Sequence, residues 1–383
     1  MKVDPYNHQE SYLEWRENVE NGVLGISPEN GKILLKFLHD MEIGINVGHG
    51  SKKGSRSFIR LKTLRDKLIF IMKKTEEIYE IRQIIDISEE KIHSIFSAMN
   101  IGKIKKKDGG TYKGVCNYVK IFKTFWHWHQ KINKKNGIEI PDITSDLDTT
   151  EEKPDWVYLT EQEVKKLCDN AKPEYKVIIM FLFDTGIRAP TELMNIKVSD
   201  FYGDFKELQI REEISKTFGR RIKLMICSEI IKNYVLENKL QKEDYLFKIS
   251  PSVVNRYFKR LAGRVFGEGN SPAGQKYSDL TMYDFRHISC CYWLPRYKSE
   301  SALKYRFGWK KSDRIHYYSE LLGMKDTINE EDMLVDVTKT EIEKRLERSE
   351  KEKELLQDKI QTMELQMAKI MELTNLLQAK FEQ

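Results

Sequence analysis

The 383-residue sequence predicts a mainly helical chain with one small antiparallel β-sheet. Three patterns support this fold class. Apolar residues recur every three or four positions between residues 58 and 134, the period of a helix with one buried face. Short extended runs replace that period between residues 205 and 226. A long helical pattern without glycine or proline follows residue 340.

Residues 58–140 are predicted to form a small helical domain. Leu61, Leu64, Leu68 and Ile71 fall on one helical face, and Ser88 is placed to cap the next helix. Residues 1–57 are weakly patterned, with one short helix expected in NGKILLKFLHDM, so we expect an accessory segment there. The aromatic residues of FKTFWHWHQ are more typical of a helical core than of a base-stacking platform. The two histidines of that run point apart on a helix, so no metal site is expected.

Residues 141–157 are acidic, carry two prolines and are predicted to be a linker. A second domain is expected over residues 158–327. Thr160 and Glu163 have the spacing of a capping box at its first helix. Further along, FKELQIREEI and RRIKLMI flank SKTFG, which is typical of a β-hairpin.

The tail, residues 328–383, is predicted to be a long helix. Its apolar residues follow the alternating spacing of a coiled coil, most regularly from Leu356 to Phe381. The same pattern also fits a helix that packs against its own domain. Self-association is the interpretation that we carry forward.

Charge is unevenly distributed, although the net charge is only +6. Residues 51–145 hold 21 Lys and Arg against 10 Asp and Glu, which is typical of a polyanion-binding segment and fits a solvated, lysine-rich surface equally well. The five cysteines have no metal-ligand spacing, so buried thiols in a reducing cytosol and no zinc site are expected. The polar start is not that of a signal peptide, and no apolar run is long enough to cross a membrane.

Three segments carry residues suited to phosphate chemistry. DTGIRAPTEL places Arg188 between a buried run and an expected helix start at Pro190. LTMYDFRHISCCYWL brings Tyr283 and Arg286 onto one face of a helix. YRFGWKKSDRIHYYSELLG places Tyr318 nine residues after Trp309. Taken singly, each segment also fits a surface arginine, a structural ion pair or a core aromatic pair.

In this order the segments resemble the motifs of the tyrosine recombinases, the family of phage integrases and chromosome-dimer-resolving recombinases. Members carry TGxR with a following EL, a hairpin lysine, HxxRH, a GH or GW pair, and a tyrosine nine residues beyond that pair. The specific resemblance covers residues 159–322. Residues 58–134 resemble the family's helical core-binding domain more loosely.

The resemblance implies roles for individual residues. Arg188 and Arg286 would clamp the phosphate, Lys216 would protonate the leaving oxygen, and Tyr318 would be the nucleophile, with Tyr317 as the less well-spaced alternative. The remaining positions implied for the catalytic site are Tyr283 and Trp309, with His287 and Glu192 in support. The positions expected to contact DNA phosphates are Lys52, Lys53, Arg56, Lys103, Lys105, Lys106 and Lys107.

The sequence departs from the family pattern at two positions. Tyr283 stands where most members have histidine, which puts the proton-transfer role of that position in doubt and resembles some archaeal members, so an archaeal mobile element is the expected source. One extra residue separates Arg188 from Glu192, and a shift within the turn would account for it.

The expected activity is site-specific DNA recombination through a 3′-phosphotyrosyl link, without metal, ATP or another cofactor. The expected partners are double-stranded DNA and further copies of the chain, in a tetramer on DNA. Two alternatives remain: strand relaxation like that of a type IB topoisomerase, and a non-catalytic DNA-binding scaffold that keeps the fold.

Overall fold

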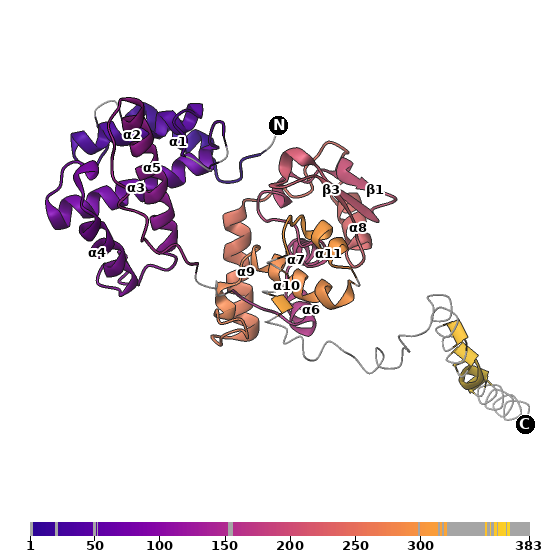
Figure 1. Cartoon of the computed structure of the whole chain (residues 1–383). Helices are drawn as coiled ribbons and strands as arrows, with labels where there is room; N and C mark the ends of the chain where they lie inside the picture. The colour runs from indigo at the N-terminus through magenta and orange to yellow at the C-terminus, as the bar shows by residue number, and fades with distance from the viewer. Residues whose placement is uncertain are drawn as a thin grey trace, which may run out of the picture. The chain divides into compact units, whose positions relative to one another are not determined.

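The computed structural model divides the chain into two compact units, Met1–Trp293 with Ser299–Lys311, and Leu294–Lys298 with Ser312–Gln383. Within the first unit we distinguish a helical lobe, residues 3–147, and a mixed lobe, residues 156–293 and 299–311 (Figure 1). The described residues are 3–19, 22–48, 51, 53–151, 156–297, 299–312, 315, 318–319, 349–350, 353, 356–357, 359–364 and 366–367.

The helical lobe contains α1 (His8–Asn18), α2 (Pro28–Ile43), α3 (Phe58–Tyr79), η1 (Ile84–Asp86), α4 (Glu89–Asn100) and α5 (Cys116–Lys135). The four predicted apolar positions of α3 are all buried, because they share one face of the helix. Ser88 caps α4 as predicted, since its hydroxyl accepts a hydrogen bond from the Lys91 N–H at 3.4 Å. The aromatic residues Phe125, Trp126 and Trp128 of α5 are buried in the core, as expected.

Within the first 57 residues, α1 and α2 share one hydrophobic core with α3, α4 and α5. The short helix expected near residue 32 is the 16-residue α2, which buries Leu34, Phe37 and Leu38. Buried polar groups hold α2 in place. The Asn30 amide donates to Glu76 of α3 at 2.6 Å, and the Trp128 indole of α5 donates to Asp40 at 2.9 Å. The weak amphipathic signal therefore understated how fully this segment is packed.

The predicted linker begins as packed chain. Ile143 and Leu147 belong to the core of the helical lobe. The Trp126 indole donates to the Pro141 carbonyl at 2.9 Å, and the Lys123 ammonium donates to the Thr144 carbonyl at 2.6 Å. Residues 152–155 lie outside the described part of the chain.

The mixed lobe combines helices with a small sheet. In chain order it contains α6 (Glu161–Asp169), α7 (Pro173–Thr185), η2 (Leu193–Asn195), η3 (Val198–Asp200), β1 (Phe201–Tyr202), β2 (Glu207–Ile210), η4 (Glu212–Ile214), β3 (Arg220–Lys223), α8 (Ser228–Glu237), α9 (Pro251–Phe266), η5 (Tyr277–Asp279), α10 (Asp284–Trp293) and α11 (Glu300–Phe307). The capping box of α6 is confirmed, with both Thr160–Glu163 hydrogen bonds present. The predicted hairpin is confirmed as β2 and β3, which pair antiparallel with β1 added at the edge.

α7 forms the centre of the mixed lobe because it is apolar on nearly every side and packs against α10.

Four of the five cysteines are buried, and burial raises the pKa of the Cys290 and Cys291 thiols. No helix among the described residues combines the length and the apolar character needed to cross a membrane.

The tail is described only in part. Its described residues between 349 and 367 are helical. Leu356, Ile360, Met363 and Met367 lie at positions of the predicted apolar seam and are more than half exposed. Most of the predicted coiled coil lies outside the described residues, so it stays a prediction.

A buried ion pair joins the end of α7 to α11 and to the end of β3. Asp184 accepts a hydrogen bond from the Arg306 guanidinium at 2.8 Å. The other oxygen of the Asp184 carboxylate accepts from the N–H groups of residues 225, 226 and 227, at 2.7 to 3.0 Å. The carboxylate therefore accepts hydrogen bonds from four donors.

We expect Asp184→Asn to destabilise the chain by about 3–5 kcal/mol, because the substitution leaves the Arg306 charge buried without its counter-ion. Urea unfolding measures the loss. Asp204→Asn is the matched control, because that carboxylate pairs with Lys232 at the surface and should cost less than about 1 kcal/mol. Equal losses in the two variants would contradict a structural role for the buried pair.

Candidate active site

The first predicted arginine lies where the chain leaves α7. Gly186 ends that helix in the left-handed conformation, at φ 57°, and Arg188 follows two residues later. The helix expected to start at Pro190 is absent. A single turn, in which the Met194 N–H donates to the Pro190 carbonyl, leads instead into the 3₁₀ helix η2. Arg188 thus sits in a tight turn between two short elements.

Glu192 holds this turn closed. The Arg188 N–H donates to one carboxylate oxygen and the Arg188 Nη1 to the other, both at 2.9 Å. The extra residue between Arg188 and Glu192 is accommodated in the turn, as expected, because the carboxylate still reaches the arginine. Glu192 is 1% exposed, so its charge must be compensated within the protein.

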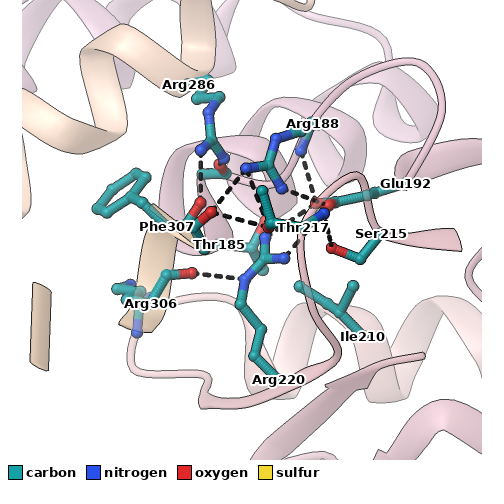
Figure 2. Close-up of polar contacts among 12 residues, drawn as sticks. Thr185, Arg188, Glu192, Ile210, Ser215, Thr217, Arg220, Arg286, Arg306 and Phe307 are labelled. Carbon is teal, nitrogen blue, oxygen red and sulfur yellow. Dashed lines mark hydrogen bonds and ion pairs between the residues drawn. The ribbon is translucent and has the colours of Figure 1, made fainter. Parts of the chain in front are cut away.

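Arg220, the second partner of this carboxylate, was not predicted from the sequence. It begins β3 and its side chain is fully buried. Its Nη2 and Nη1 donate to the two Glu192 oxygens at 2.9 and 3.2 Å (Figure 2). The alternation of side chains along the strand could have indicated its burial, because Arg220 and Ile222 share the inward face of β3. A buried arginine in that pattern requires an acidic partner.

The second predicted arginine, Arg286, lies in the first turn of α10 and is 5% exposed. Its Nη1 donates to the Gly186 carbonyl at 2.6 Å, and its Nη2 donates to the Phe307 carbonyl. Its guanidinium lies over the rings of Phe307 and Trp309, at 5.5 and 5.8 Å from their centroids. Arg286 is therefore held by the ends of both α7 and α11.

Three arginines meet three successive carbonyls at the end of α11. The Arg220 Nε donates to the Arg306 carbonyl at 2.8 Å, Arg286 to Phe307, and the Arg188 Nη2 to Gly308 at 2.8 Å (Figure 2). The last carbonyls of a helix lack partners within it and carry partial negative charge. The carbonyls at the end of α11 thus hold both predicted arginines close together.

Electrostatics keep Glu192 ionised despite its burial. Burial raises its pKa, but the hydrogen bonds and charges of Arg220 and Arg188 outweigh that effect and lower the pKa from 4.5 to about 2. Glu192 therefore carries its full negative charge at neutral pH.

Lys216 lies in the connection between β2 and β3 and is exposed. Its neighbour Thr217 anchors the connection to this cluster. The Thr217 hydroxyl donates to the Gly308 carbonyl at 2.9 Å and accepts from the Arg188 Nη2 at 3.4 Å. The predicted lysine thus extends from a loop that is fixed beside Arg188.

Tyr283 and Arg286 differ in environment although they are three residues apart. Arg286 is buried, whereas Tyr283 is 55% exposed and its ring meets His287 edge-on, with centroids 5.2 Å apart. His287 also stacks on Trp156, with ring centroids 4.8 Å apart. His287 therefore takes part in an aromatic stack. Trp309 stacks on Phe307 at 4.9 Å, beside Arg286.

Tyr318 belongs to the second unit and is 3% exposed. Its place relative to the arginines stays a prediction, and Tyr317 lies outside the described residues. Of the predicted DNA-contacting residues, Lys52 is also outside them, and Arg56 is half-buried. The exposed ones are Lys53, Lys103, Lys105, Lys106 and Lys107. Across the described ranges no cluster of His, Cys, Asp and Glu is arranged to hold a metal ion.

Comparison with known proteins supports the fold. A family model described as "Phage integrase family" matches residues 157–324, and no curated protein matches the sequence. XerH site-specific recombinase, in a post-cleavage complex with palindromic difH substrate, has a TM-score of 0.56 at 13% identity, covering 85% of this chain and 88% of that one.

A lambda integrase dimer bound to a COC′ core site has a TM-score of 0.54 at 16% identity, covering 81% of this chain and 98% of that one. The Tn1549 transposon integrase with transposon right-end DNA has a TM-score of 0.53 at 14% identity, covering 76% and 93%. The predicted fold class, mainly helical with a small antiparallel sheet, is confirmed.

The low pKa of Glu192 makes its contribution to stability depend on pH. A carboxyl whose pKa is lower in the folded chain stabilises it above the unfolded pKa, and this contribution disappears as pH falls toward the folded pKa. We expect wild type to exceed Glu192→Gln in stability by roughly 3 kcal/mol above pH 5, and the difference to shrink between pH 4.5 and 2. Urea unfolding of both proteins across this range measures it, and a constant difference would contradict the assignment.

Proposed function

We propose that the chain is a site-specific DNA recombinase that cuts and rejoins strands through a 3′-phosphotyrosyl intermediate. The observation that carries this proposal is the pair of arginines, Arg188 and Arg286, held close together by the end of α11. Two guanidinium groups fixed in this way suit the non-bridging oxygens of one phosphodiester. The family match over residues 157–324 and the fold shared with DNA-bound recombinases add support.

In the proposed reaction Tyr318 is the nucleophile. Its hydroxyl oxygen attacks phosphorus and displaces the 5′ oxygen of the next nucleotide, so the bond energy is kept in the phosphotyrosyl ester. Attack of a 5′ hydroxyl on that ester rejoins a strand and releases the tyrosine. The reaction needs no ATP, metal or other cofactor, because each step exchanges one phosphoester for another.

The remaining site residues have supporting roles in this proposal. Arg188 and Arg286 stabilise the negative charge that develops on the phosphate oxygens. Lys216, extended from the hairpin loop, donates a proton to the leaving 5′ oxygen. Trp309 packs beside Arg286, and Tyr283, with His287 behind its ring, contacts the phosphate in place of the histidine found in most tyrosine recombinases. That tyrosine also supports an archaeal mobile element as the source.

DNA binding is proposed to use the exposed lysines of the helical lobe. Lys103, Lys105, Lys106 and Lys107 lie in the loop between α4 and α5, with Lys53 and Arg56 before α3. Contacts of this kind bind phosphates and weaken steeply as salt is added. Lys52 is proposed to join them.

Exchange of strands requires several chains on one DNA junction, and we propose a tetramer on paired sites. The apolar seam of the tail favours self-association, since multivalent linkage raises the local concentration of chains. Light scattering of the full chain and of a chain ending at residue 340 tests this part. An unchanged oligomeric state after truncation would rule out the tail as the contact.

Tyr318→Phe should abolish the covalent protein–DNA adduct and leave DNA binding nearly unchanged, because only the nucleophilic oxygen is removed. The measurement is denaturing electrophoresis after incubation with nicked attachment-site DNA. Tyr317→Phe is the matched control and should keep the adduct. Loss of the adduct in the control alone would reassign the nucleophile. Relaxed circles without recombinant junctions would favour a topoisomerase, and DNA binding by wild type without any adduct would favour a scaffold.

Arg188→Ala or Arg286→Ala should raise the cleavage barrier by about 2.7–4 kcal/mol, the effect of removing one donor to a developing oxyanion. Single-turnover cleavage at saturating protein measures this separately from binding. Arg221→Ala, which removes a half-exposed arginine of the same sheet, is the control and should cleave normally. Near-normal cleavage by either clamp variant would show that the phosphate binds elsewhere.

A further inference from the structure

Arg220 is a cation with no role in the reaction proposed above. Its side chain is fully buried, and it contacts both oxygens of Glu192 as well as the Arg306 carbonyl. Burying an arginine costs free energy unless its partner compensates the charge. Arg220 is matched to Glu192 in this way, yet the same carboxylate also pairs with Arg188.

Because Arg188 and Arg220 both pair with Glu192, the net charge of these three side chains depends on whether Arg220 is present. If Glu192 faced Arg188 alone, the pair would be neutral and only Arg286 would supply positive charge. With Arg220 present, two cations face one carboxylate, and the cluster keeps one net positive charge. Charges within a few ångströms in a site of low water content interact strongly, so one unit of charge matters greatly to a bound phosphate.

Arg220 also connects the cluster to the hairpin loop. β3 begins at Arg220, four residues after Lys216, and Thr217 lies between them with its hydroxyl on the Gly308 carbonyl. The same guanidinium therefore fixes the end of the loop that presents Lys216. Arg220 therefore both compensates the charge of Glu192 and anchors the loop that carries Lys216.

We propose that Arg220 is a positioning residue of the cleavage site, which neutralises Glu192 so that this carboxylate does not cancel the positive charge that Arg188 presents to the scissile phosphate. The proposal rests on the recombinase function proposed above. It differs from a purely structural role, in which Arg220 would only join β3 to α11. The two roles predict different results when the charge of Glu192 is removed together with that of Arg220.

The test compares wild type, Arg220→Met, Glu192→Gln, the double variant and Arg221→Met. Arg221 is the matched control, because it follows Arg220 on β3, points outward and pairs with Glu207 at the surface. Circular dichroism checks that each variant is folded. Single-turnover cleavage of nicked site DNA is measured from pH 6 to pH 8, and DNA binding is measured separately.

We expect Arg220→Met to cleave about 100-fold more slowly than wild type, comparable to loss of one charged donor. The double variant should recover at least about tenfold of that loss, since the excess negative charge is gone. Arg221→Met should match wild type. A double variant as slow as or slower than Arg220→Met would overturn the proposal, because a structural defect is not repaired by removing a second hydrogen-bonding partner.

The pH profile is the second readout. Without Arg220 the buried Glu192 loses its stronger partner, so its pKa should rise. Lower pH then protonates Glu192 and frees the charge of Arg188, so cleavage by Arg220→Met should increase from pH 8 to pH 6 relative to wild type. An unchanged ratio of the two rates across this range would overturn the proposal. The charged groups around the carboxylate are Arg188 on its own turn, Arg220 on β3, Arg286 on α10, and the Arg306–Asp184 pair of α11 and α7.

A third readout does not depend on cleavage. Inorganic phosphate at constant ionic strength should stabilise wild type against heat, and its affinity should fall about tenfold in Arg220→Met and return in the double variant. If wild type forms no adduct while phosphate affinity follows this order, the recombinase function fails and the role of Arg220 stands. Equal phosphate affinity in all the variants would overturn the role of Arg220 and leave cleavage to be judged on its own.

Discussion

The carboxylate of Glu192, buried between two guanidinium groups, is the interaction on which the mixed lobe depends. It draws together the turn after α7 and the strand β3, and through the same arginines it reaches the end of α11. These segments are distant in sequence. Glu192 and Arg220 are almost fully buried, so removing either one would leave the charge of the other in the interior without its main partner.

The end of α11 turns this electrostatic cluster into a defined shape. A helix presents its last carbonyls at fixed spacing, and here three of them receive three different arginines. The positions of the two proposed clamp residues are therefore set by backbone geometry, which varies less than side-chain rotamers.

Periodic patterns made the helices predictable. The buried face of α3, the cap at Ser88 and the capping box at Thr160 are local, so the residues involved identify them without the fold. Segments with weak periodicity were underestimated, since α2 is held partly by buried polar contacts such as Asn30 with Glu76. The helix expected at Pro190 was wrong, because the Glu192 carboxylate closes the chain into a single turn there.

The residues of the candidate site that lie in sequence motifs could be predicted, whereas those that only the fold brings to it could not. Arg188 and Arg286 were found from their motifs, and the fold places them together. Arg220 was missed because its partner comes from a distant turn, and an arginine in a short strand resembles any surface cation until its burial is known.

The conformation and the small size of Gly308 also matter for the position of Arg220. Gly308 adopts φ 63°, and a β-carbon there would lie 3.0 Å from the Arg220 guanidinium and 3.2 Å from the Thr217 hydroxyl. The glycine of the Gly-Trp pair therefore does more than allow a turn, since the β-carbon it lacks leaves room for the side chain of Arg220, which comes from β3.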